Sequence, residues 1–251
     1  MTHALVLGRR ALREGIRTPE AIVPTLFIPI FFLVVNTGQA AKIFPSSSTG
    51  FLHGQGYGAF QLPTTLLLAS SFGAAALFLV EEIEGGYFDK LRATPIPRWS
   101  VVVGRLIAEA AKCVAITAVI ILLALPFGIS IKSGPLGFVL LIALTAGWGV
   151  VYSGFMQLIA LKSRSAAATQ SGGLIFFPLL FLTPNFVPRH MLAHPMEVAA
   201  TINPVTYLME ALRSLILKDL DWAHIWPGFA VLAGLGALML WLNVRVISHY
   251  D

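Results

Sequence analysis

Cysteine and charge are both scarce in this chain. Its 251 residues include one cysteine, Cys113, which lies inside an apolar run, so the chain can form no intrachain disulfide and offers no thiol framework for a metal. Charged residues make up only 12% of the sequence, whereas 57% is hydrophobic. Soluble domains have roughly twice that share of charge. We therefore expect an integral membrane protein.

Motifs for nucleotide hydrolysis and for metal catalysis are also missing. No GxxxxGK[ST] phosphate loop occurs, and the glycines of residues 54–58 lack both the lysine and the strand-to-helix context. His190 and His194 have the spacing of a zinc protease, but Met191 stands in place of the activating glutamate. The basic residues are scattered and form no stripe for nucleic acid. We expect no metal site, no cofactor bound by this chain and no nucleic-acid partner.

Apolar runs near the roughly 20 residues of a spanning helix recur along the chain. Residues 36–58 are rich in Gly and Ser and indicate a loop between the first two runs. A cleaved signal peptide is the alternative for the first run, but no small-x-small cleavage site follows Val35. We predict an all-α membrane protein with one domain, residues 1–251, and six spans at about residues 21–37, 59–80, 101–127, 136–160, 168–187 and 225–247.

The segment before the first predicted span combines basic and apolar residues. Residues 1–19 contain four arginines beside Leu5, Val6, Leu12 and Ile16. This pattern is typical of a helix that lies in the headgroup region, and the alternative is a frayed basic tail. We predict an N-terminal interfacial helix.

The positions of Lys and Arg predict the orientation. Most of them fall in segments that the six-span topology places on one side, and by the positive-inside rule that side is the cytoplasm. Both termini and residues 81–100 are then cytoplasmic. The basic residues on that side are Arg9, Arg10, Arg13, Arg17, Lys90, Arg92, Arg98, Arg105, Lys162, Arg164 and Arg245, and those on the other side are Lys42, Lys132, Arg189, Arg213 and Lys218.

Residues 81–100 form the longest charged interruption between apolar runs. Gly85 and Gly86 can end one helix, residues 87–93 can form about two turns of another, and Pro95 with Pro97 stops it. We predict a short polar helix at the membrane surface, which would suit a soluble partner. An ordinary charged loop is the alternative.

A second short helix is expected before the last span. Asn203 and Pro204 provide an N-cap and a first-turn proline for a helix that runs to about Leu217. This helix is too short to cross a bilayer and carries Glu210 and Arg213. We predict that residues 188–222 form re-entrant or surface-lying helices on the outer side.

One pair of opposite charges lies inside the third predicted span. Glu109 and Lys112 are three residues apart and can lie on one side of a helix, where each charge alone would be unfavourable. Such a pair can be structural, or it can mark a substrate or proton path.

Two sequence blocks resemble the membrane subunits of type-2 ABC transporters, and of daunorubicin-resistance exporters in particular. The first is Asp89, Lys90, Leu91 and Arg92 within a pattern that includes Gly86, Thr94, Pro95 and Arg98. The second begins at Asn203, Pro204 and continues to Arg213. Both occur in the family's order and cover nearly the whole chain. The resemblance implies that Glu84, Gly86, Tyr87, Phe88, Asp89, Lys90, Leu91, Arg92, Thr94, Pro95 and Arg98 form a coupling helix for an ATPase. It also implies that Asn203, Pro204, Thr206, Glu210 and Arg213 belong to outer re-entrant helices.

The same resemblance implies the partners and the activity. We expect an exporter in the bacterial inner membrane that carries a lipophilic or amphipathic molecule such as a drug, lipid or glycan precursor. Its partners would be two ATPase subunits, which bind ATP and Mg, and a second permease as homodimer or heterodimer. A secondary transporter is the alternative, but it needs ion-coupling groups near the midplane and often shows inverted repeats, which the sequence does not display. An intramembrane enzyme would need a catalytic cluster that is also missing.

We predict that charge reversal at Asp89 together with Arg92 abolishes transport, because both charges would contact the rim of the partner's cleft. The variant should still reach the membrane. Export assays on vesicles of equal protein content test this, and export at the wild-type rate would contradict it.

Overall fold

The computed structural model is helical in the parts of the chain that it describes, residues 2–17, 19–72, 75–92, 94 and 96–249. No β-strand occurs within these ranges, which confirms the all-α prediction. In chain order the helices are α1 (Thr2–Ile16), α2 (Pro19–Ala40), α3 (Tyr57–Ser71), α4 (Ala75–Glu84), α5 (Tyr87–Arg92), α6 (Trp99–Ala124), α7 (Gly134–Ser163), α8 (Ala166–Gly173), α9 (Phe176–Phe181), α10 (His194–Ile202), α11 (Pro204–Leu217) and α12 (Trp222–Ser248). Three 3-10 turns, η1 (Gly50–Leu52), η2 (Leu125–Phe127) and η3 (Arg189–Met191), lie between them.

The described residues include five helical stretches that are long and apolar enough to cross a membrane. Each overlaps one of the predicted spans, and the second consists of α3 followed by α4. The protein is therefore a multi-pass membrane protein. The five stretches are Val23–Ala40, Tyr57–Glu84, Trp99–Phe127, Gly134–Ser163 and Trp222–Ser248.

The predicted count of six spans is not confirmed, because residues 168–187 do not form one long helix. They fall in α8, in α9 and in the irregular segment that follows. At about 1.5 Å per residue, the apolar stretch Ala166–Phe181 would reach only roughly 24 Å even as one helix. The physical reason for the break is local: Gly172 and Gly173 favour helix weakly, and the ring of Pro178 interrupts the hydrogen-bond ladder. The prediction of a span here was based on hydrophobicity, which does not reveal such breaks.

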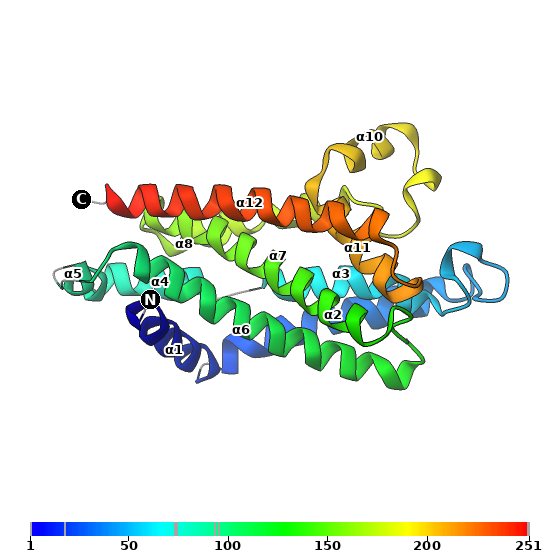
Figure 1. Cartoon of the computed structure of the whole chain (residues 1–251), viewed down its shortest axis with the longest axis horizontal. Coiled ribbons are helices and arrows are strands. Elements are labelled where there is room, and N and C mark those ends of the chain that lie inside the picture. Colours follow the sequence, from blue (N-terminus) through cyan, green and yellow to red (C-terminus); the bar gives the residue numbers. More distant parts are fainter. Residues whose placement is uncertain (1, 18, 73–74, 93, 95, 250–251) are drawn as a thin grey trace.

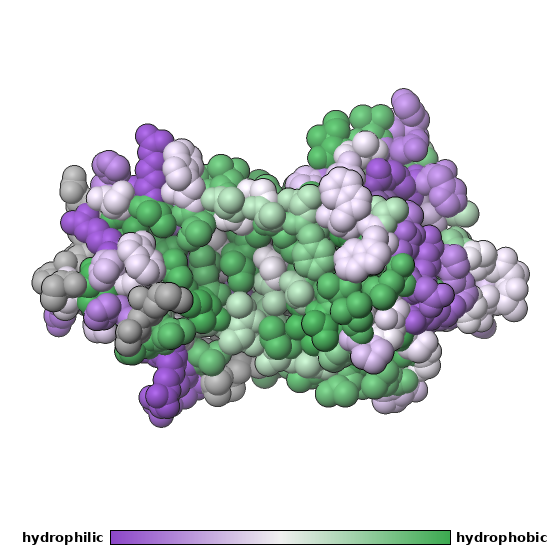
Figure 2. Space-filling view, viewed as in Figure 1, coloured by the Kyte–Doolittle hydropathy of each residue, from purple (hydrophilic) through white to green (hydrophobic). Residues whose placement is uncertain are grey.

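The bundle has two distinct ends (Figure 1). One end, called the α5 end below, carries α5, α1 and the end of α12, and the other, the α11 end, carries η1, α10 and α11. The chain passes from the α5 end, where α7 finishes, to the α11 end through α8 and α9. Figure 2 shows apolar residues over the middle of the bundle and hydrophilic residues gathered towards both ends, as a bilayer requires.

Helix α11 lies inside the bundle and not on its surface. It packs against α3, α7 and α12, and the side chains of Leu208, Leu212 and Leu215 are fully buried. The helix is therefore not exposed on the surface of the protein itself. Helix α11, which ends at Leu217, is buried on most of its circumference. Its apolar side chains therefore pack against other parts of the protein and not against lipid.

Helix α1 lies against the beginning of α6 at the α5 end (Figure 1). The two helices meet at Gly8 and Gly104, where a Cβ atom on Gly8 would lie 2.9 Å from the carbonyl oxygen of Gly104. Leu5 and Val6 of α1 are 58% and 64% exposed. Small residues thus let the helix axes approach closely while an apolar face of α1 remains outward.

We predict that Gly8→Ala lowers the free energy of unfolding by about 1–2 kcal/mol, because the new methyl group meets rigid backbone of α6. Gly15→Ala in the same helix is the matched control. No atom lies within 4 Å of a Cβ atom at Gly15, so better helix propensity should leave the protein unchanged or stabilise it by about 0.5–1 kcal/mol. Unfolding in detergent measures both variants, and equal stabilities would contradict the close contact.

Candidate functional site

The segment between α4 and α6 forms a short helix with a sharp entry, as the sequence predicts. Gly86 has a φ of 71°, the left-handed conformation that glycine adopts without strain, and its amide donates to the carbonyl of Ile83 at 3.1 Å. Helix α5 then covers only Tyr87–Arg92. Of the predicted coupling residues, Pro95 and the side chains of Asp89 and Arg92 lie outside the described residues.

A carboxylate between two arginines ties this segment to the bundle. An oxygen of Glu82 in α4 accepts a hydrogen bond from Arg10 of α1 at 2.7 Å, and its other oxygen accepts one from Arg105 of α6. Glu82 and Arg105 are buried, so their charges are screened little by solvent. The guanidinium of Arg10 also lies 4.2 Å above the ring of Tyr87 in α5. This cluster of Arg10, Glu82, Arg105 and Tyr87, called the arginine clamp below, joins α1, α4, α5 and α6.

The two aromatic residues at the start of α5 have different environments. Phe88 is 1% exposed and packs into the protein's own core, so its ring is not part of the exposed surface of α5. Because α5 is so short, one ring must hold it to the bundle, and Phe88 does so. Tyr87 is 37% exposed and Leu91 is half-buried. Glu84, Lys90, Thr94 and Arg98 are exposed.

Arg98 connects α6 to the end of α12. Its guanidinium donates a hydrogen bond to the carbonyl of Ser248 at 3.0 Å, which places the last turn of α12 beside the α5 segment. The α5 segment is therefore fastened at both of its ends, by the arginine clamp before it and by α12 after it.

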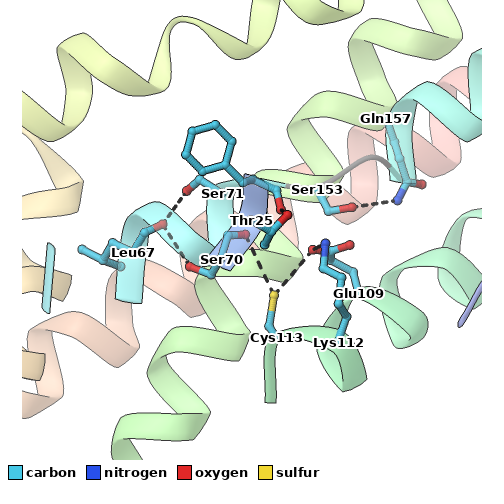
Figure 3. A network of polar contacts seen from close by, with 10 residues as sticks. Thr25, Leu67, Ser70, Ser71, Glu109, Lys112, Cys113, Ser153 and Gln157 are labelled. Carbon is cyan, nitrogen blue, oxygen red and sulfur yellow. Dashed lines mark hydrogen bonds and ion pairs between the residues drawn. The ribbon is translucent and has the colours of Figure 1, made fainter. Parts of the chain in front are cut away.

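A second polar cluster lies in the middle of the bundle (Figure 3). Lys112 contacts an oxygen of Glu109 at 2.5 Å, which confirms the predicted pair, and the thiol of Cys113 donates to the same oxygen at 3.5 Å. Glu109 is 3% exposed, whereas the side chain of Lys112 is 25% exposed. The lysine thus reaches outward while it compensates a buried carboxylate. On α7, Gln157 donates to the hydroxyl of Ser153 at 3.3 Å.

Two neighbouring cavities adjoin this cluster. A small one of about 10 Å³ is lined by Glu109 together with Ser70, Ser71 and Ser153. The larger has a volume of about 330 Å³ and shares Ser71, Tyr152 and Met156 with the first. Its remaining wall is mostly apolar and comes from α8, α9 and their surroundings, with Phe72, Leu77, Gln170, Gly173, Leu174, Phe176 and Phe177. An apolar cavity beside a paired carboxylate can hold a molecule with an apolar body and a polar group.

The predicted residues near the α11 end occupy a third polar region. Asn203 caps α11 by accepting from the amide of Val205 at 3.0 Å, which confirms the predicted cap, and Pro204 occupies the first turn. Glu210 binds Arg189 through two hydrogen bonds of 3.0 and 2.7 Å. Thr206 is fully buried.

Arg213 is enclosed by backbone carbonyls and an aromatic ring. It donates to the carbonyls of Pro184 at 3.0 Å and Phe60 at 3.4 Å, and its guanidinium carbon lies 3.6 Å from the centre of the Phe60 ring. Burial lowers the pKa of Arg213 to about 9, against the opposing effect of Glu210. The guanidinium therefore keeps its charge at neutral pH.

A hydrogen-bond network near Arg213 was not predicted from the sequence. The amide of Gln61 in α3 donates to the hydroxyl of Tyr57 at 2.9 Å and to the carbonyl of Asn185 at 3.1 Å. The hydroxyl of Thr64 donates to the side chain of Asn185 at 2.5 Å. The available signal was the presence of Gln61 and Thr64, one helical turn apart, in an otherwise apolar run.

The histidines at 190 and 194 do not form a metal site. They lie in η3 and at the start of α10, so they do not share one face of a helix as the zinc-protease pattern would need. The described part of the chain contains no group of three or more His, Cys, Asp or Glu residues that could hold a metal ion.

Comparison with known families decides which class of protein this geometry belongs to. The profile of the family described as "ABC-2 type transporter" matches residues 2–217. The chain belongs to this family. It is also similar to the "Daunorubicin resistance ABC transporter permease protein DrrB1" of Streptomyces coeruleorubidus, with 24% identity over 244 residues, 96% of this chain and 84% of that protein.

Membership of the ABC-2 type transporter family accounts for the architecture described above. The chain is a membrane permease subunit of an ABC exporter, with several apolar helices. The matched residues begin in α1 and end with α11, so they include the arginine clamp, the central cluster and the Arg213 region. These three polar regions are therefore the candidate functional positions of an ABC-2 permease.

We predict that Glu82→Ala lowers the free energy of unfolding by about 3 kcal/mol, because it removes the carboxylate that compensates two guanidinium groups. Glu81→Ala is the matched control, since Glu81 is exposed and its loss should change stability by less than about 0.5 kcal/mol. Unfolding of both variants in detergent provides the measurement. A loss of the same size in the two variants would show that the arginine clamp is not structurally important.

Proposed function

We propose that this permease subunit transmits the force of a separate ATPase to a transport path for a lipophilic or amphipathic molecule. Two ATPase subunits bind ATP and Mg, and a second permease, identical or different, completes the path. The assembly lies in the bacterial inner membrane with both termini of this chain and α5 in the cytoplasm. The concentration of basic residues near the α5 end supports this orientation.

The fastening of α5 is the observation that carries this proposal. Helix α5 exposes Tyr87 and Lys90, yet Phe88 and the arginine clamp hold it to three other helices. A partner that grips the exposed side therefore gains a rigid connection to α1, α4 and α6. A loose charged loop would absorb the same displacement.

Domain closure of the ATPase pair would push α5 and tilt the helices joined to it. Interlocked helices respond to such a push as rigid bodies that slide or rotate against their neighbours. The small central cavity lies between α3, α4, α6 and α7, and the larger one between α3, α4, α7 and the segment of α8 and α9. Relative tilting of these elements would change access to both cavities. This coupling needs no nucleotide site in the permease itself.

The apolar cavity supports the proposed substrate class. Its phenylalanines suit a flat or branched apolar body, and Gln170, Tyr152 and the adjoining serines offer polar contacts. The similarity to a permease named for daunorubicin resistance points in the same direction. Glu109 and Lys112 would then border the transport path and keep the carboxylate compensated while it is in contact with substrate.

Co-purification followed by transport in vesicles tests the proposal. Purified in mild detergent from its native membrane, the permease should be recovered with a stoichiometric nucleotide-binding subunit, and the complex should transport only when ATP is supplied. Lys90→Glu should reduce ATP-dependent transport by about fivefold or more, because it reverses a charge on the gripped surface.

Lys162→Glu is the matched control, since Lys162 is exposed in the last turn of α7 and lies outside the α5 segment. It should retain the wild-type rate. Transport that proceeds without a nucleotide-binding partner and follows an ion gradient would instead identify a secondary transporter.

A further inference from the structure

The cavity of largest volume among the described residues lies at the α11 end, and the proposed function does not involve it. Its volume is about 950 Å³, and it lies between the loop that contains η1, the turn η3 and helix α11. We call it the distal cavity. Figure 2 shows hydrophilic residues gathered at this end of the molecule, next to apolar ones. Its lining includes Phe44, Phe51, His53, Arg213, Ser214 and Lys218.

Two buried hydrogen-bond donors in the wall of this cavity lack acceptors. Arg213 is 9% exposed and uses two of its nitrogens on carbonyl groups, but its Nη2 has no hydrogen-bond partner among the described residues. The hydroxyl of the adjacent Ser214, which is 5% exposed, has none either in the described chain. Buried polar groups in native proteins nearly always have partners, and an unmade hydrogen bond to a charged group is especially unfavourable.

The charges around the cavity favour an anion as the missing acceptor. Among the lining residues, the cations Arg189, Arg213 and Lys218 outnumber the carboxylates Glu197 and Glu210. Glu210 binds Arg189 through two hydrogen bonds and acts on Arg213 only through its charge, since the hydrogen-bond partners of Arg213 among the described residues are neutral carbonyls. Lys218 lies at the rim, where it forms an ion pair of 4.0 Å with Asp221. Burial lowers the pKa of His53, and so do Lys218 and Lys132, which reflects a positive local potential.

An aromatic wall adjoins Arg213 in this cavity, because the Phe60 ring lies 3.6 Å from its guanidinium carbon. The ring centres of Phe44 and Phe51 are 5.6 Å apart, and those of Phe51 and Phe60 are 5.0 Å apart. A ligand that contacts both the guanidinium and this wall has oxyanion oxygens next to hydrocarbon. A simple hydrated anion would leave the aromatic wall in contact with water.

We propose that the distal cavity binds a phosphate or carboxylate oxyanion, which accepts hydrogen bonds from Arg213 and Ser214 while Lys218 attracts it at the rim. The aromatic wall favours the headgroup region of an anionic lipid as the source of this oxyanion, and a soluble phosphate is the other source. The site requires no ATPase and no transport, so its failure would leave the proposed exporter function untouched.

Direct binding to the purified full chain in a non-ionic detergent tests the proposal. Calorimetry with dihexanoyl phosphatidic acid should show saturable binding to one site per chain. Ser214→Ala should weaken that binding about tenfold, because a hydrogen bond to a charged group is lost, and Lys218→Ala about threefold. The matched control is Lys42→Ala, an exposed lysine of the long loop after α2 that does not line the cavity and should leave binding unchanged.

Inorganic phosphate identifies the source. Binding at least tenfold weaker than that of phosphatidic acid supports a lipid headgroup, whereas equal affinity supports a soluble phosphate in the same oxyanion site. Arg213→Lys, which keeps the charge, checks that the fold survives loss of the guanidinium and should also weaken binding. No saturable binding of either probe, or affinities that Ser214→Ala and Lys218→Ala leave unchanged, would overturn the proposal.

Discussion

The carboxylate of Glu82 is the interaction on which the α5 end of the protein depends. A charge buried among helices needs an opposite charge or hydrogen-bond partners to compensate it, and Glu82 is shared by Arg10 and Arg105. Because these arginines come from α1 and α6, one side chain of α4 connects this helix to both of them. The ring of Tyr87 extends the connection to α5. Mechanical stiffness at this end therefore follows from the need to compensate charge.

The same constraint organises the other polar regions along the bundle. Glu109 is compensated by Lys112, and Glu210 by Arg189, while Arg213 relies on carbonyl groups and an aromatic face. Arg213 and Ser214 each have a donor without a partner among the described residues, and both line the distal cavity. The proposed oxyanion site is where two such donors come from adjacent residues.

Close helix contacts determine which helices can move together. Gly8 and Gly104 bring α1 and α6 into backbone contact, and a Cβ atom on Gly149 of α7 would lie 2.3 Å from the sulfur of Cys113 in α6. Helices that meet through small residues have little lateral freedom. In contrast, α8 and α9 are short, the helix is interrupted between them, and both of them line a cavity. Closely packed long helices thus lie next to the short helices α8 and α9. The tilting of helices that we propose for transport would need both.

The sequence by itself determined the membrane class, the all-α fold, the short helix after Gly86 and the capped helix at Asn203. Each depends on local chemistry: the length of an apolar run, a glycine in the left-handed conformation, or an asparagine side chain that accepts a hydrogen bond from the amide two residues later. The sequence also indicated the family, because each of its two motifs is one continuous stretch of the chain. Only the tertiary structure decided that Phe88 faces inward, that α11 is buried and that Gln61 meets Asn185. These features depend on contacts between residues far apart in sequence, and neither periodicity nor hydropathy specifies which buried surface a side chain will meet.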